Sequence, residues 1–202
     1  MKIFVFDTET TGFISKKETD LTKQPHIVQF AGILGELDKG VFTEEKRVDI
    51  LINPGVPIPF WASQVHHLYD IDVKNAPLIW EVIDQIIDLI NTPDIIIGHN
   101  IEYDESMVKL ELRRRDQEHS YQPKKTECTM KTTVDYCSIQ GNGARFKYPK
   151  LGELHKKLFD EYFSWAHDAL VDVEATLRCY LDLVNKWVLK AETNTQNVQS
   201  LF

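Results

Sequence analysis

The sequence predicts a mixed α/β fold in which a single β-sheet is flanked by helices. Three successive apolar or alternating runs, at residues 2–7, 27–37 and 47–53, are typical of β-strands. A segment with apolar residues at three- and four-residue steps then predicts a helix over 78–91, and the short apolar run 94–98 predicts a buried strand. Strands first, then a helix, a strand and further helices indicate a mixed sheet whose first three strands are antiparallel.

The sequence also predicts the connections between these elements. The polar segment 12–25 is expected to be a loop, and Lys39-Gly40 a hairpin turn between the second and third strands. The proline-rich segment 53–59 cannot form regular structure, and it leads into a short helix that begins near Trp61. Pro93 ends the helix that precedes the buried strand.

The second half of the chain is mainly helical. Four further helices are expected, at residues 102–118, 129–137, 150–160 and 168–191. Residues 138–149 are expected to be a loop. We expect residues 1–191 to form one domain and the polar residues 192–202 to form a flexible tail.

Composition excludes several classes of protein. No segment approaches the roughly 20 apolar residues that a membrane-spanning helix needs, and the amino terminus does not resemble a signal peptide. The cysteines are Cys128, Cys137 and Cys179, an odd number without CxxC spacing. A disulfide framework and a zinc site are therefore not indicated, and a reducing, cytoplasmic location is expected.

Charge is distributed unevenly along the chain. The net charge is −8, but residues 109–157 contain twelve Lys and Arg against six Asp and Glu, a local charge of +6. A basic middle beside an acidic remainder suits a polyanion held next to metal ions, although solvated surface charge explains such a distribution as well.

Two acids lie at the end of the first strand, in the stretch Asp7-Thr8-Glu9-Thr10-Thr11-Gly12. Alternate side chains of a strand share one face, so Asp7 and Glu9 point the same way. Two neighbouring carboxylates repel each other, and a cation between them removes that cost. The sequence therefore predicts a divalent-metal site at the end of this strand.

Further acids stand where two helices begin. After the buried strand, Asp104 is expected on the sheet-facing side of its helix, with Glu102 as an alternative. The last helix contains Asp168 and Asp172, preceded by His167; Asp172 lies beside the apolar face that should meet the sheet. Taken singly, such acids are more often solvated or favour the positive end of a helix.

Three stretches occur in a fixed order: Asp-Thr-Glu-Thr-Thr-Gly, Gly-His-Asn-Ile-Glu-Tyr-Asp and His-Asp-Ala-Leu-Val-Asp. Together they resemble the motifs of the DEDDh exonucleases, the DnaQ-like family of the proofreading subunit of bacterial DNA polymerase III. The resemblance covers residues 2–185 and implies a ribonuclease-H-like fold with a five-stranded mixed sheet.

The resemblance also implies roles for individual residues. The four metal-binding acids would be Asp7, Glu9, Asp104 and Asp172, and they would hold two divalent cations, Mg²⁺ or Mn²⁺. His167 would be the base that deprotonates the attacking water. Asp168 stands at a variable position and receives no chemical role.

Substrate contacts are implied for Thr10 and Thr11, which match positions that approach the terminal nucleotide. His66 matches a histidine that borders the substrate base, and Asn100 matches a residue that positions its turn. The family's glycine after that histidine is His67 here, which is a departure.

The implied activity is 3′→5′ exonucleolytic release of nucleoside 5′-monophosphates, most directly from the 3′ end of single-stranded or frayed DNA in proofreading or repair. Two alternatives stay open: an RNA-trimming enzyme of the ribonuclease T or oligoribonuclease kind, and an inactive nucleic-acid-binding subunit on the same fold.

Remaining features have competing explanations. Phe60 and Trp61 are expected to pack under the proline loop, although they could frame a base. Arg113–Arg115 are expected to be a solvated helix face. Phosphate contacts are expected instead from loop residues, namely Lys124, Lys125, Arg145, Lys147 and Lys150. The terminal Ser200-Leu201-Phe202 resembles the end of a sliding-clamp-binding peptide, which makes a clamp or polymerase a candidate partner, although a disordered tail explains it as well.

Overall fold

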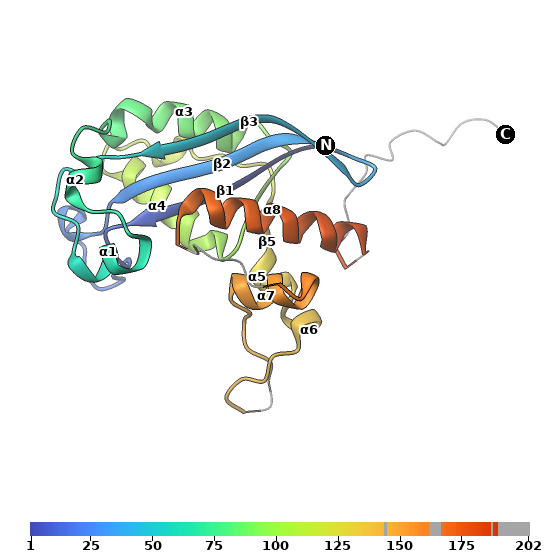
Figure 1. The fold of residues 1–202 in the computed structure, drawn as a ribbon. Coiled ribbons are helices and arrows are strands. Elements are labelled where there is room, and N and C mark those ends of the chain that lie inside the picture. Colours follow the sequence, from blue (N-terminus) through green and yellow to red (C-terminus); the bar gives the residue numbers. More distant parts are fainter. Residues whose placement is uncertain (144, 162–166, 187, 190–202) are drawn as a thin grey trace, which may run out of the picture.

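The computed structural model describes residues 1–143, 145–161, 167–186 and 188–189. Its centre is a five-stranded sheet in the order β3-β2-β1-β4-β5 (Figure 1). The first three strands are antiparallel and the last two run parallel to β1, so the predicted mixed sheet is confirmed. The strands are β1 (Lys2–Thr10), β2 (Ile27–Asp38), β3 (Val41–Leu51), β4 (Ile95–Gly98) and β5 (Thr126–Cys128).

Helices connect and cover the strands. The longer ones are α1 (Phe60–His66), α3 (Ile79–Asn91), α4 (Ile101–Arg113), α7 (Leu151–Phe159) and α8 (Ala169–Asn185). Single turns form α2 (Asp70–Val73), α5 (Thr129–Thr132) and α6 (Val134–Cys137), with 3₁₀ turns η1 (Leu21–Lys23) and η2 (Glu118–Ser120). The predicted tail, residues 192–202, lies outside the described residues.

The hairpin turn predicted at Lys39-Gly40 is present. Both residues have positive φ, 48° and 83°, as a tight two-residue hairpin requires. The following strand begins at Val41 rather than at residue 47. Its first half is charged and exposed, because β3 is an edge strand, and this composition concealed it in the sequence.

Several helix predictions need correction. The helix predicted over 102–118 ends at Arg113, and the one predicted over 129–137 is interrupted at Thr133 into α5 and α6. Neither α2 nor β5 was predicted, since four and three residues are too few to show a period. None of the described helices combines the length and the hydropathy that a bilayer span requires.

The sheet divides the core into two layers. Phe4 and Phe6 of β1 face α3 and α4 and stack on each other with ring centroids 5.6 Å apart. Ile3 and Val5 face the opposite way, toward α8. Figure 1 shows α8 crossing one face of the sheet, with α3 and α4 on the other. The alternation of β1 thus decides which layer each later residue of the strand meets.

Candidate active site

The end of β1 continues this alternation with polar residues. Asp7 and Glu9 are odd-numbered and face the α8 layer, while Thr8 faces the α4 layer. The pairing of β1 with β2 is also irregular here: Glu9 pairs with Gln29 but Thr10 pairs with Ile27, so the extra residue, Val28, lies in β2. Bulges bend a strand and redirect side chains, which suits the rim of a site.

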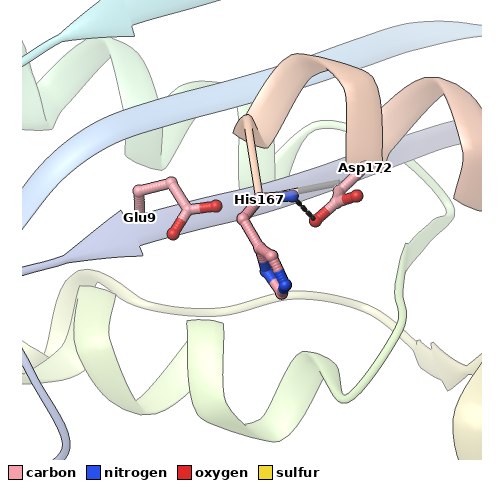
Figure 2. Close-up of side chains that lie close together, drawn as sticks. All are labelled: Glu9, His167 and Asp172. Atoms are coloured by element: carbon pink, nitrogen blue, oxygen red, sulfur yellow. Dashed lines mark hydrogen bonds between the residues drawn. The ribbon is translucent and has the colours of Figure 1, made fainter. Parts of the chain in front are cut away.

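Three potential metal ligands converge on the α8 side. One ligand atom from each of Glu9, His167 and Asp172 lies within 4.8 Å of the other two. Figure 2 shows Glu9 approaching from β1 and the other two residues from the start of α8. The backbone N–H of His167 also donates to Oδ2 of Asp172 over 3.1 Å, which ties the turn to the acid.

Asp104 reaches the site from the opposite layer. It lies in the first turn of α4 and is only 3% exposed. Its Oδ1 accepts hydrogen bonds from the backbone N–H of Thr8 at 3.0 Å and from the Thr8 hydroxyl at 2.6 Å. The prediction that Asp104 faces the sheet is therefore confirmed. Glu102, its alternative, is exposed and pairs with Lys131.

The four acids perturb one another strongly. Burial, and then the charges of Asp104 and Glu9, raise the pKa of Asp7 well above its usual range. Burial, followed by the charge of Asp172, raises the pKa of Glu9 to about 9. Burial also raises the pKa of Asp104 to about 7, although the Thr8 hydrogen bonds act against this. Such acids are costly to ionise together unless a cation is bound.

The donor set fits a hard divalent cation. Carboxylate oxygens are the ligands that Mg²⁺ and Mn²⁺ prefer. In addition, Oδ1 of Asp172 is buried and has no hydrogen-bond partner among the described residues. A buried carboxylate oxygen without a partner is unusual, and a bound metal ion would supply the missing interaction.

The start of α8 separates two acids that look alike in the sequence. Asp168 caps the helix, because its Oδ1 accepts from the backbone N–H groups of Leu170 at 3.0 Å and Val171 at 3.2 Å. Asp168 has no chemical role assigned from the sequence, and in the structure its role is to cap α8. His167 precedes this cap with φ of 75° and an exposed side chain, so its imidazole is open to solvent.

Hydrogen bonds hold the segment Thr10-Thr11-Gly12 in place, and we call this segment the wall. The Thr10 hydroxyl lies 2.8 Å from the Tyr103 hydroxyl, which itself donates to the Gly12 carbonyl at 2.6 Å. The Thr11 hydroxyl accepts from the His26 N–H at 2.9 Å. Both threonines are buried and tied to the protein, and their contact with a terminal nucleotide stays a prediction.

An exposed aromatic stack stands beside this wall. Phe13 is 78% exposed and stacks on Trp61 with centroids 5.7 Å apart, while Tyr103 meets it edge-on at 6.3 Å. The predicted core packing of Phe60 and Trp61 is wrong, since they are 73% and 50% exposed. A Cβ on Gly12 would lie 3.2 Å from the Trp61 ring, so this glycine accommodates the stack. Sequence reasoning missed Phe13, although an aromatic residue directly after the acidic motif was a usable signal.

His66 ends α1 within the protein interior. It is 4% exposed, its Nδ1 accepts from the Leu68 N–H at 3.1 Å, and its Nε2 has no partner in hydrogen-bond geometry among the described residues. Burial lowers its pKa, although the nearby Thr10 backbone acts in the opposite direction. A neutral imidazole is therefore favoured, and its contact with a base stays a prediction.

Two residues adopt the left-handed conformation that glycine usually supplies. His67, where the family has glycine, has φ of 61° and ends α1 through an N–H bond to the Ser63 carbonyl. His67 thus adopts the left-handed conformation that a glycine would take at this helix end. Asn100 has φ of 74° and begins α4, which brings Asp104 to the site within one helical turn.

A buried ion pair fixes the segment that hydrogen-bonds Thr11 of the wall. Glu111 of α4 and Arg114, the residue that follows α4, lie 2.8 Å apart with side chains 2% and 15% exposed. Arg114 donates to the carbonyls of Leu21, Gln24 and Pro25, and Glu111 accepts from the Ile27 N–H. The predicted solvated arginine face is therefore wrong for Arg114, which fixes the segment that bonds Thr11.

Comparison with known proteins identifies the same family as the three sequence motifs. A family model described as Exonuclease (RNase_T) matches residues 4–180. A DNA polymerase III subunit epsilon-like protein of Rhodobacter capsulatus is 33% identical over 100 residues, which are 50% of this chain and 13% of that protein. A PolC-type DNA polymerase III of Caldanaerobacter subterraneus subsp. tengcongensis is 25% identical over 187 residues, 90% of this chain and 11% of that protein. The chain thus spans only a small part of these curated relatives.

Solved structures share the fold. Exonuclease X in complex with 5′-overhanging duplex DNA has a TM-score of 0.59 at 21% identity, with 94% of this chain and 95% of that one covered. The zinc-bound complex of E. coli exonuclease I with single-stranded DNA has a TM-score of 0.71 at 18% identity, with 92% and 40% covered. With the family model spanning residues 4–180, the chain belongs to the exonuclease family, in its DEDDh, DnaQ-like branch.

Proposed function

We propose that this protein is a metal-dependent 3′→5′ exonuclease that releases nucleoside 5′-monophosphates from single-stranded or frayed DNA ends. The observation that carries this proposal is the convergence of Asp7, Glu9 and Asp172 on one side of β1 with Asp104 on the other. A subunit that only binds nucleic acid has no use for four acids whose ionisation opposes one another. The inactive-subunit alternative is disfavoured for that reason.

Each acid would contribute according to its position. Glu9 and Asp172 lie close enough to share one ion. Asp7 is near enough to Asp104, Glu9 and Asp172 for their charges to raise its pKa, so it would contact both ions, and Asp104 would serve the second. When bound, two divalent ions supply charge neutralisation and water activation for phosphodiester hydrolysis. We name Mg²⁺ or Mn²⁺, because the four acids contribute only hard oxygen donors.

His167 would take the proton from the attacking water. Its imidazole is exposed beside Glu9 and Asp172, and an imidazole is the side chain that enzymes most often use as a general base. The N–H bond from its own backbone to Asp172 keeps the base beside the acid. Proton acceptance next to the ion ligands is what hydrolysis of a phosphodiester requires.

The terminal base would rest against the aromatic stack. Phe13 presents most of its ring to solvent above the Thr10-Thr11 wall, and bases stack on exposed aromatic rings. Stacking of this kind needs an unpaired base, which supports a single-stranded or frayed 3′ end. The DNA complexes of exonuclease X and exonuclease I support DNA over RNA.

We infer the location from the cysteines and the partners from the names of the curated relatives. The three cysteines are all free and buried, which supports the cytoplasm as the site of action. Both curated relatives carry DNA polymerase III names, which supports association with a polymerase or its clamp. Pull-down with a sliding clamp, comparing the chain with its Leu201→Ala/Phe202→Ala variant, tests that association.

The decisive test uses three end-labelled substrates: single-stranded DNA, duplex DNA and RNA. Each is incubated with Mg²⁺, Mn²⁺ or Zn²⁺, beside an Asp7→Asn control. Mononucleotide release from single-stranded DNA by the wild type alone is the expected result. Faster shortening of RNA would establish the ribonuclease alternative, and no shortening of any substrate would establish the binding-subunit alternative.

A further inference from the structure

A hairpin projects from the body of the protein between α6 and α7 (Figure 1). We call its described residues, 139–143 and 145–148, the finger. Gln140 and Phe146 form an antiparallel bridge, the Lys147 N–H donates to the Ile139 carbonyl at 2.9 Å, and the Gly141 N–H donates to the Arg145 carbonyl at 3.2 Å. The finger is therefore a folded element with its own backbone pairing.

The finger has the composition of a nucleic-acid contact. Phe146 and Tyr148 are 43% and 57% exposed, and neither belongs to a hydrophobic cluster of the described residues. Arg145 is exposed, and its guanidinium forms no hydrogen bond or ion pair within the described part of the chain. Residues 138–150 contain three basic side chains and no acid, in a chain whose net charge is −8.

The base of the finger is fixed at the level of the active site. His99 follows β4, and the pairing of Val5 with Ile97 places it level with Asp7 on the neighbouring strand. Its Nε2 donates to the Pro149 carbonyl over 3.0 Å, and burial lowers its pKa to about 4, so the ring is neutral. The His99 side chain thus links the base of the finger to the end of β4, the strand next to the one that carries Asp7 and Glu9.

We propose that the finger binds single-stranded nucleic acid on the 5′ side of the nucleotide that is cleaved. This inference rests on the proposed exonuclease activity and adds a second contact to it. Phe146 and Tyr148 would stack on unpaired bases, and Arg145 would contact a phosphate. From Pro149, four extended residues reach at most about 14 Å, which corresponds to roughly two to four stacked nucleotides.

Lys147 is left out of this binding surface. Its Nζ lies 2.6 Å from Oε1 of Glu153 in the first turn of α7, so it fastens the finger to the helix. The same Glu153 accepts from the Lys150 N–H at 2.8 Å. These contacts hold the finger in place and leave Arg145 and the two rings to face solvent.

The test compares two substrates of different length. The p-nitrophenyl ester of thymidine 5′-monophosphate occupies the catalytic centre alone, whereas single-stranded DNA of about 12 nucleotides also reaches the finger. The variants are Phe146→Ala/Tyr148→Ala and Arg145→Ala. Their matched controls are Trp80→Ala, an aromatic residue 54% exposed on α3, and Lys46→Ala, an exposed cation on β3.

We expect the aromatic double variant to raise KM for the oligonucleotide about tenfold, with kcat/KM for the ester within about twofold of wild type. Arg145→Ala should reduce the salt dependence of oligonucleotide binding by about one phosphate contact. Wild-type KM for the oligonucleotide in the finger variants would overturn the proposal. So would an equal loss on both substrates, since that would reflect altered folding.

A binding measurement separates this inference from the proposed activity. Fluorescence anisotropy of the 5′-labelled oligonucleotide, recorded without divalent metal, reports binding whether or not the protein cleaves. If wild type hydrolyses neither substrate, the exonuclease proposal fails, and weaker binding by the finger variants than by their controls still supports the finger as a contact. Equal binding by all variants would refute it.

Discussion

The Thr8 hydroxyl donates to Oδ1 of Asp104 over 2.6 Å, and the Thr8 N–H donates to the same oxygen over 3.0 Å. These two bonds join the central strand to α4 at the point where the acids meet. They also favour the ionised form of Asp104 against its burial. Thr8 is therefore the residue that keeps the fourth acid both placed and available to a cation.

Replacing Thr8 by Val removes the hydroxyl while keeping a β-branched side chain that suits a strand. We expect the Mg²⁺ concentration for half-maximal activity to rise about 10-fold or more, as is usual when a residue that orients a metal ligand is lost. Thr8→Ser, which keeps the hydroxyl, should resemble wild type. An unchanged Mg²⁺ requirement in Thr8→Val would contradict the role given to this bond.

His167→Ala should lower turnover by about 10²–10⁴ at neutral pH, because no other described residue replaces the proton acceptor. Metal and DNA affinity should change little, since the backbone N–H that bonds Asp172 remains. Single-turnover kinetics combined with calorimetric Mn²⁺ binding separates the two effects. Near-wild-type turnover would remove His167 from the mechanism.

The perturbed acids predict how stability depends on pH. The unfolded chain ionises such groups near pH 4, whereas the folded chain keeps Glu9 protonated to about pH 9 and Asp104 to about pH 7. The folded state therefore binds more protons in this window, so the free energy of unfolding of the metal-free protein falls as pH rises through it.

Thermal unfolding between pH 5 and pH 9, with and without Mg²⁺, measures this effect. Each kcal/mol lost should lower Tm by about 2–4 °C. Mg²⁺ should restore more Tm at high pH than at low pH, because protons and metal compete for the same oxygens. In Asp7→Asn the decline should be shallower, and an equally steep decline there would show that other groups cause it.

Arg114→Ala should destabilise the protein by about 3 kcal/mol or more, because it leaves the buried Glu111 carboxylate without its cation. Although burial opposes ionisation of Glu111, the hydrogen bond from His26 and the charge of Arg114 keep its pKa below the usual value. Arg113→Ala is the matched control, since its pair with Glu118 is exposed and should contribute under about 1 kcal/mol. Urea unfolding of both variants decides whether the pair is structural.

Phe13→Ala should raise KM for single-stranded DNA about 10-fold or more, because one base loses its stacking surface. Stability should change little, since the ring is mostly exposed. Phe60→Ala serves as the comparison, because Phe60 is 73% exposed on α1 but is not part of the Phe13–Trp61 stack. Equal KM values for the two variants would argue against a role for Phe13 in base contact.

Sequence patterns predicted the site better than they predicted its surroundings. The common face of Asp7 and Glu9 could be predicted because side chains alternate along a strand. The position of Asp172 could be predicted because it lies beside an apolar helix face. The roles of Phe13 and Arg114 depend on which loop folds against which helix, and no local period records that. The strand β5 was not predicted for a different reason: three residues are too few to show an alternation.

The four acids are divided among three elements in two layers: β1 in the sheet, α8 on one face and α4 on the other. A chain whose helices have not yet docked contains every ligand but no place for a metal. If the four acids are the metal ligands, as proposed, nuclease activity requires that both helices have docked on β1. A molecule in which α4 or α8 has not docked would therefore lack that activity.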